Sequence, residues 1–314
     1  MQNFADRLID AIQKKGNPVC VGLDPRFDLL PQKIRDEAVK AHSNTARAVA
    51  QAFVVFNKAL VDAVADVVPV CKPQIAFYEE FGAEGIRAFE ETVRYAKQKG
   101  LIVISDAKRG DIGTTAVAYA RAHLGGLEIT GGAGVGFDAD ALTVNPYMGH
   151  DTLQPYLDIG ATNGKGLFVL VKTSNLGSGD LQDLEAKGKP IYEHVADMIR
   201  KLGEKHRGKS GFTPVGAVVG ATYPQQARRL RELMPDSIFL VPGYGAQGAA
   251  AADAAASFRS DGLGAVVNAS RSIIFAYKQE PYASQFGEAK FAEAARAATE
   301  QMAKELNAAL ARPA

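Results

Sequence analysis

Short apolar runs recur along the whole chain and are separated by segments with a helical pattern. The runs are rich in valine and isoleucine and almost continuous in apolar character, which is typical of parallel strands covered on both faces. They occupy residues 18–23, 68–72, 101–105, 141–145, 167–171, 216–220, 237–241 and 264–268. The pattern therefore predicts eight strands of a largely buried parallel sheet.

Between the predicted strands, apolar residues are spaced three and four positions apart, which predicts amphipathic helices. The clearest examples are residues 44–65, 84–99 and 223–234. Eight alternations of strand and helix favour a closed (β/α)8 TIM barrel, and a doubly wound open sheet is the alternative. Because no linker rich in serine and proline interrupts the pattern, we expect one domain over residues 1–314.

Both ends of the chain add a helix to this barrel. Near the N-terminus, Phe4, Leu8, Ile9 and Ile12 fall on one face of a helical segment that carries charges throughout. That segment lacks the apolar core of a signal peptide. The stretch from about 285 to 311 is amphipathic and rich in alanine. We expect this last helix to lie outside the barrel.

Composition and charge narrow the class of protein. With 36 basic and 35 acidic side chains, the formal net charge of +1 gives no reason to expect a nucleic-acid partner. No segment approaches eighteen uninterrupted apolar residues, so we expect no membrane insertion and a cytoplasmic protein. Cys20 and Cys71 lie inside apolar runs, which favours buried free thiols over a disulfide or a metal-binding pair.

Polar residues follow most of the predicted strands. In a TIM barrel the active site lies beyond the carboxyl ends of the strands, where the connecting loops converge. One charged residue at a strand end is usually a cap or a solvated loop residue, but several at one rim indicate a binding site. In chain order these residues are Asp24, Lys72, Asp106, Lys108, Asn145, Lys172, Thr173, Ser174, the segment 242–248 and the segment 268–271.

The stretch SDAKRGDIGTT, which follows the third predicted strand, places two acids and two bases within six positions. Because strand side chains alternate, Asp106 and Lys108 point the same way and are expected to form an ion pair. Gly110 permits a turn that puts Asp111 at the mouth of the loop, facing its own barrel or a neighbouring subunit. Together with Lys72, these charges would form a nearly neutral array that keeps its members ionised. A purely structural salt-bridge network is the alternative.

These motifs resemble those of the orotidine 5'-phosphate decarboxylase family. The resemblance follows the barrel in order, with GLDPR, CKPQ, DAKRGDIGTT, VPGYGAQG and NASR at the first, second, third, seventh and eighth strands. The D-x-K-x-x-D pattern alone is less specific, because related barrels that use magnesium on keto-sugar phosphates share it. Those relatives typically have a metal-binding carboxylate where this chain has Lys72. Added segments near 26–45, 122–140 and 174–210 make the chain similar to the larger-subunit branch of the family.

The resemblance implies conversion of orotidine 5'-phosphate to uridine 5'-phosphate (UMP) and carbon dioxide in pyrimidine biosynthesis, with no metal and no cofactor. It implies that Lys108 protonates C6 of the pyrimidine, that Asp106 lies against the substrate carboxylate, and that Lys72 holds Asp106 and a ribose hydroxyl. It also implies a homodimer in which Asp111 and Thr115 reach the site of the partner subunit.

The resemblance further implies a set of substrate-binding residues. Asp24 would bind the ribose, and Ser174 would bond the pyrimidine edge, with Thr173 an almost equal candidate. The others are Gln247 between base and phosphate, Arg271 at the phosphate, and Pro242 and Asn268 at the last two strand ends.

The chemistry itself favours an array of fixed charges. Loss of carbon dioxide from C6 leaves an electron pair in the plane of the ring, where ring resonance cannot readily absorb it, so a desolvated ammonium must stabilise it. Two other classes stay open: a magnesium-dependent sugar-phosphate aldol synthase or decarboxylase, and a non-catalytic phosphometabolite-binding barrel. Lys72 argues against the first class, and two carboxylates at the mouth of an anion site argue against the second. The glycine-rich stretch 131–139 lacks a preceding strand, so we expect a flexible connection there.

Overall fold

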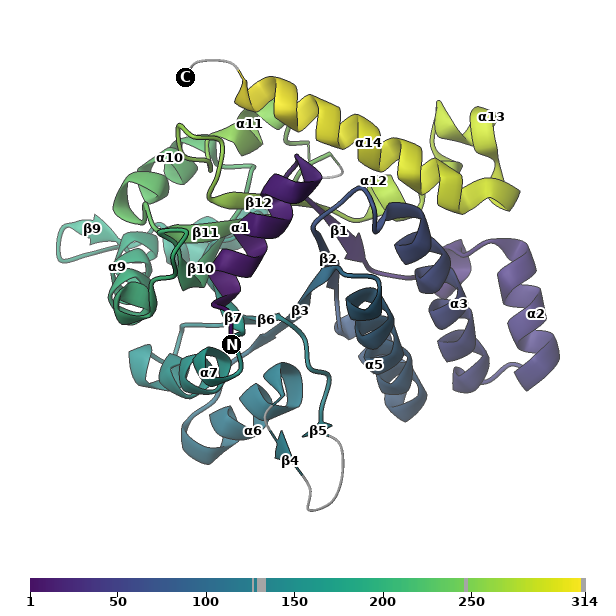
Figure 1. Ribbon diagram of the computed structural model, residues 1–314, viewed down its shortest axis with the longest axis horizontal. Coiled ribbons are helices and arrows are strands. Elements are labelled where there is room, and N and C mark those ends of the chain that lie inside the picture. The colour runs from purple at the N-terminus through teal and green to yellow at the C-terminus, as the bar shows by residue number, and fades with distance from the viewer. Residues whose placement is uncertain (126, 129–133, 246–247, 312–314) are drawn as a thin grey trace.

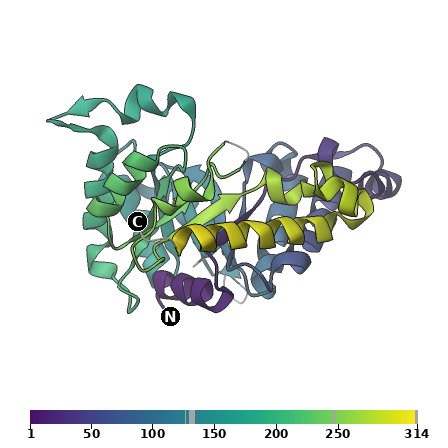
Figure 2. The same ribbon diagram turned by 90° about the horizontal axis from the view of Figure 1, so that it is seen from above.

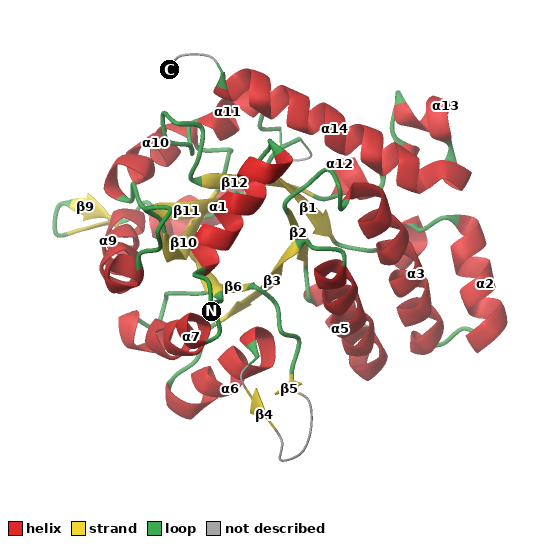
Figure 3. Cartoon of the chain, in the orientation of Figure 1, coloured by secondary structure: helices red, strands yellow, loops and turns green. Residues whose placement is uncertain are grey.

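Eight parallel strands close into a barrel surrounded by helices in the computed structural model, which describes residues 1–125, 127–128, 134–245 and 248–311 (Figure 1). Figure 3 shows these strands at the centre of the helical ring. Their order around the barrel is β1-β12-β11-β10-β7-β6-β3-β2. The predicted barrel and its eight predicted strands are therefore confirmed, and the open sheet is excluded. The strand bounds are β1 (Val19–Leu23), β2 (Val70–Pro73), β3 (Ile102–Arg109), β6 (Ala141–Val144), β7 (Gly166–Lys172), β10 (Thr213–Val219), β11 (Ser237–Val241) and β12 (Ala265–Ala269).

The strands are apolar throughout because successive side chains point alternately into the barrel and out toward the helices. In β1, Val19 and Val21 belong to the core shared with the outer helices, whereas Cys20 belongs to the cluster that fills the barrel interior. In β12, Val267 lies in the outer core and Val266 in the inner one. Burial on both faces explains why the sequence shows continuous apolar runs instead of alternation.

Helices cover the outside of the barrel. The three predicted helical segments correspond to α3 (Ala46–Val64), α5 (Gly82–Gln98) and α10 (Pro224–Leu233). The remaining helices that lie between the first and last strands or just beyond them are α2 (Gln32–His42), α4 (Ala76–Glu79), α6 (Gly113–Leu124), α7 (His150–Thr162), α8 (Gly179–Gln182), α9 (Ile191–Gly203), α11 (Ala251–Ala255), α12 (Arg271–Ile274) and α13 (Tyr282–Phe286).

Both predicted terminal helices are present. α1 (Phe4–Lys15) buries its apolar face in the interior cluster and closes the N-terminal end of the barrel. α14 (Phe291–Leu310) lies along the outside against α3, α11 and α12 (Figure 2). It begins six residues later than predicted because α13 and a short 3-10 turn precede it. Among the helices of the described residues, none is long and apolar enough to span a bilayer.

Two short antiparallel hairpins were not predicted from the sequence. They pair β4 (Leu127–Glu128) with β5 (Gly134–Val135), and β8 (Glu185–Ala186) with β9 (Lys189–Pro190). The prediction of a flexible connection is therefore wrong for Gly134 and Val135, and residues 131–133 lie outside the described part. Strands of two residues are too short to show a periodic pattern.

Candidate active site

A cavity of about 570 Å³ opens at the carboxyl ends of the barrel strands. Its floor includes Leu170, Val218 and Leu240, which come from β7, β10 and β11. Polar side chains from several strand ends surround this apolar floor. Of the predicted site residues, the cavity wall contains Asp24, Lys72, Asp106, Lys108, Ser174, Pro242, Asn268 and Arg271.

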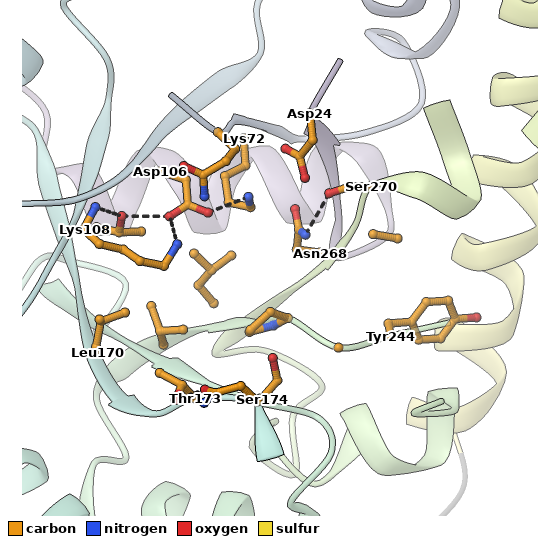
Figure 4. A pocket seen from close by; sticks show the side chains of 18 of the residues that line it. Asp24, Lys72, Asp106, Lys108, Leu170, Thr173, Ser174, Tyr244, Asn268 and Ser270 are labelled. Atoms are coloured by element: carbon orange, nitrogen blue, oxygen red, sulfur yellow. Dashed lines mark hydrogen bonds and ion pairs between the residues drawn. The ribbon is translucent and has the colours of Figure 1, made fainter. Parts of the chain in front are cut away.

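One carboxylate and two ammonium groups form the charged wall of the cavity. Lys72 Nζ lies 2.8 Å from Asp106 Oδ2, and Lys108 Nζ lies 2.6 Å from Asp106 Oδ1 (Figure 4). Lys72 and Asp106 are only 5% and 7% exposed, whereas Lys108 is exposed to the cavity. The predicted ion pair and the addition of Lys72 to it are confirmed.

The charges in this group keep each other ionised. Burial alone would raise the pKa of Asp106, but the positive charges of Lys72 and Lys108 outweigh it and hold that pKa well below its usual range. Burial alone would lower the pKa of Lys72, but the carboxylates of Asp106 and Asp24 outweigh it and raise that pKa. Asp106 and Lys72 are therefore both charged at neutral pH.

Thr173 and Ser174 lie across the cavity from Asp106 and Lys108 (Figure 4). The Thr173 hydroxyl accepts a hydrogen bond from Gln182 Nε2 at 2.8 Å and donates one to Asn175 Oδ1 at 2.7 Å. For the Ser174 hydroxyl, the described residues supply no hydrogen-bond partner. Ser174 is consequently the side chain of this pair that is free to bind a ligand.

The third part of the cavity wall consists of residues at and just beyond the ends of β1 and β12, which are paired neighbours in the barrel. Asp24 has one buried carboxylate oxygen for which the described part of the chain offers no hydrogen-bond partner. Asn268 accepts from Cys20 Sγ at 3.6 Å and donates to Ser270 Oγ at 3.4 Å. Both Asn268 and Ser270 line the cavity. Arg271, at the start of α12, adds a positive charge at this end of the cavity.

Several predicted rim residues lie elsewhere. Asp111 and Thr115 follow β3 but do not line the cavity of their own chain. The predicted array thus has three members instead of four within the described part of one chain. Gln247 lies outside the described residues. Lys172 is wholly buried, with Nζ 2.7 Å from Asp183 Oδ1 and 4.4 Å from the centre of the Tyr223 ring, so it turns away from the cavity.

The cavity residues that were not predicted from the sequence include Thr143, within the apolar run of β6, and Gln182, in α8. Gln182 reaches the cavity because the insertion after β7 folds back over the strand end, and the sequence contains no signal for that path. Thr143 is the one polar side chain in the run ALTV, which could have indicated a functional role.

Comparison with known proteins identifies the family. The model of the orotidine 5'-phosphate decarboxylase / HUMPS family matches residues 17–286. The chain belongs to this family. It is 47% identical over 306 residues to the orotidine 5'-phosphate decarboxylase of Rhodopirellula baltica, covering 98% of this chain and 99% of that protein.

Solved structures show the same relationship. The structure of Leishmania donovani OMP decarboxylase matches with a TM-score of 0.72 and 33% identity over 98% of this chain and 99% of that chain. Leishmania donovani UMP synthase matches with a TM-score of 0.76 and 34% identity. That match covers 100% of this chain and 58% of the UMP synthase chain.

Proposed function

We infer that this chain is an orotidine 5'-phosphate decarboxylase, which releases carbon dioxide and forms UMP in pyrimidine biosynthesis. The observation that carries this inference is the Asp106 carboxylate held between Lys72 Nζ at 2.8 Å and Lys108 Nζ at 2.6 Å, in the cavity at the strand ends of a chain of this family. We also propose that residues 1–314 act as one catalytic domain in the cytoplasm. Cys20 and Cys71 are both buried free thiols, which agrees with a reducing compartment.

The charged wall fits the electronic demand of the reaction. As the bond between C6 and the carboxylate breaks, its electron pair stays on C6, in the plane of the ring. The Lys108 ammonium stabilises this charge and then transfers a proton to C6, and Lys108 later regains a proton from water. Asp106 disfavours the nearby substrate carboxylate, and Lys72 keeps Asp106 ionised. No bound electron sink is needed for these steps.

The remaining cavity residues fit the other parts of the nucleotide. The unpaired oxygen of Asp24 and the ammonium of Lys72 are suited to ribose hydroxyls. The free hydroxyl of Ser174 faces the charged wall across the space for the pyrimidine ring (Figure 4). Arg271 supplies the charge for the phosphate, whose oxygens match a guanidinium in geometry. From family resemblance, Gln247 completes the contacts between base and phosphate, and Pro242 and Asn268 shape the wall.

We further propose a homodimer in which Asp111 and Thr115 complete the site of the partner subunit. Both residues lie at the rim but outside their own cavity. The apolar side chains of Ile112, Tyr147 and Met148 at the same rim are 61%, 79% and 46% exposed. Apolar side chains gathered on one exposed surface favour association with another protein surface.

Hybrid dimers test this arrangement. A Lys108→Ala chain and an Asp111→Ala chain should each be inactive alone. Random pairing of the two during co-expression gives about half heterodimers, each with one intact site, so about a quarter of the wild-type activity should return. If Asp111 serves its own chain's site, every heterodimer carries two defective sites and the mixture stays inactive.

A magnesium-dependent reaction on a sugar phosphate is the second candidate, because related barrels with that chemistry share the D-x-K-x-x-D pattern of Asp106, Lys108 and Asp111. The position of Lys72 disfavours it, because an ammonium 2.8 Å from Asp106 already neutralises the carboxylate that a divalent cation would need. Two assays distinguish the candidates. Absorbance loss from orotidine 5'-phosphate in excess chelator supports the decarboxylase, and turnover only of a hexulose phosphate with magnesium supports the synthase.

A further inference from the structure

The hydroxyl of Thr143 connects the Asp106 carboxylate with the backbone of Ala107 and Lys108. Thr143, on β6, is 1% exposed and lines the cavity. Its Oγ1 accepts hydrogen bonds from the backbone N–H groups of Ala107 at 3.0 Å and Lys108 at 2.9 Å. It donates one to Asp106 Oδ1 at 3.0 Å. A hydroxyl has one donor and two acceptor positions, and all of them are used here.

The need for this hydroxyl arises from an irregularity in the barrel. Along the pairing of β3 with β6, Ser105 is opposite Leu142 but Arg109 is opposite Val144, so β3 contains extra residues between these points. The N–H groups of Ala107 and Lys108 thereby lose their regular strand partners, and Thr143 lies opposite the gap. Its side chain replaces the missing backbone acceptor.

The irregularity also puts Lys108 in an unusual conformation. Its φ is +48°, in the left-handed region that residues other than glycine rarely adopt. Such a conformation persists only when surrounding contacts hold it. The bond from the Lys108 N–H to Thr143 Oγ1 is one of those contacts, and it acts on the backbone from which the ammonium extends to Asp106.

We propose that Thr143 is a positioning residue for the decarboxylation: its hydroxyl fixes the backbone of Lys108 and the rotation of the Asp106 carboxylate. Oδ1 of Asp106 contacts the Thr143 hydroxyl and the Lys108 ammonium, and Oδ2 contacts the Lys72 ammonium. These different partners define one orientation of the carboxylate. This inference rests on the proposed function. It assigns Thr143 no contact with the substrate's phosphate or ribose, so its removal should affect the reaction step more than binding.

The test compares Thr143→Val, which keeps the volume and removes the hydroxyl, with Thr143→Ser, which keeps the hydroxyl. We expect the valine variant to lose about 10- to 100-fold in kcat, as the loss of hydrogen bonds at a charged group and a small displacement of the ammonium would cause. KM and the Kd of UMP should change by less than about 3-fold. The serine variant should keep kcat within about 5-fold of wild type.

A second pair covers the case in which the valine variant fails to fold. Thr143→Ser and Thr143→Ala differ only in the hydroxyl, and the serine variant should exceed the alanine variant about 10-fold or more in kcat. Equal kcat in that pair, or a loss confined to KM and UMP affinity, would overturn the positioning role. Wild-type protein that does not decarboxylate orotidine 5'-phosphate would overturn the proposed function and this inference with it. An active wild type whose Thr143 variants all keep the wild-type kcat would overturn only the inference.

Discussion

Replacing His123 should make the protein's stability less sensitive to acid. His123 lies on α6, is 2% exposed, and has Nδ1 2.8 Å from Ser105 Oγ. Burial, and after it the positive charge of Arg109, lowers the pKa of His123 from 6.5 to about 3. The folded protein therefore keeps this imidazole neutral where the unfolded chain would already be protonated.

The sign and size of the effect follow from the two pKa values. Because the folded pKa is the lower one, the unfolded state binds the proton more readily, and stability falls as pH drops below about 6.5. Between pH 7 and pH 5, protonation of this histidine in the unfolded state raises the ratio of unfolded to folded protein by about 1.4 powers of ten, and each power of ten corresponds to about 1.4 kcal/mol. His123 should thus account for about 2 kcal/mol of the stability lost over this interval.

Urea unfolding at pH 7 and pH 5 measures this contribution. In His123→Asn, the loss of free energy of unfolding between the two pH values should be about 2 kcal/mol smaller than in wild type. The absolute stability of the variant can fall through the smaller side chain, but that cost does not depend on pH. His150→Asn, which changes an exposed histidine, is the matched control. Equal pH dependence in wild type and His123→Asn would show that the buried imidazole is not held neutral.

Three further predictions concern the cavity. Arg271→Ala should weaken UMP binding about 10- to 100-fold without changing uridine binding, since a charge-assisted bond to phosphate is lost; calorimetry that finds equal losses for both ligands would rule out a phosphate contact. Ser174→Ala should weaken UMP binding about 10-fold, whereas Thr173→Ser stays within about 3-fold; the reverse order would assign the pyrimidine contact to Thr173. Lys72→Met should lower the free energy of unfolding by about 3 kcal/mol, because Asp106 loses one of its two cationic partners inside the barrel; an unchanged urea midpoint would contradict the strong coupling of this pair.

Much of the fold could be predicted because burial controls the strand pattern. Each barrel strand is covered on both faces, so residues such as Val19, Val21 and Val267 appear in continuous apolar runs. The carboxyl ends of parallel strands lie on one rim, so the polar residues after those runs were expected to meet, and Lys72, Asp106 and Lys108 do.

The remaining features depend on contacts that a linear pattern does not contain. Lys172 occupies the same kind of strand-end position as Lys72, yet Asp183 from the following insertion pairs with it and turns it away from the cavity. The role of Thr143 depends on a register shift between two strands, which becomes visible only when both are paired. The hairpins consist of strands of two residues, below the length at which periodicity can be recognised.

The most direct test of the decarboxylase function follows the ultraviolet absorbance of orotidine 5'-phosphate with purified protein in excess chelator, for wild type and Lys108→Ala. We expect rapid conversion to UMP by wild type and loss of conversion by the variant, with UMP binding and dimerisation retained in both. Conversion by Lys108→Ala at the wild-type rate would remove Lys108 as the proton donor. A folded, dimeric wild type that leaves the substrate unchanged would contradict the decarboxylase function itself.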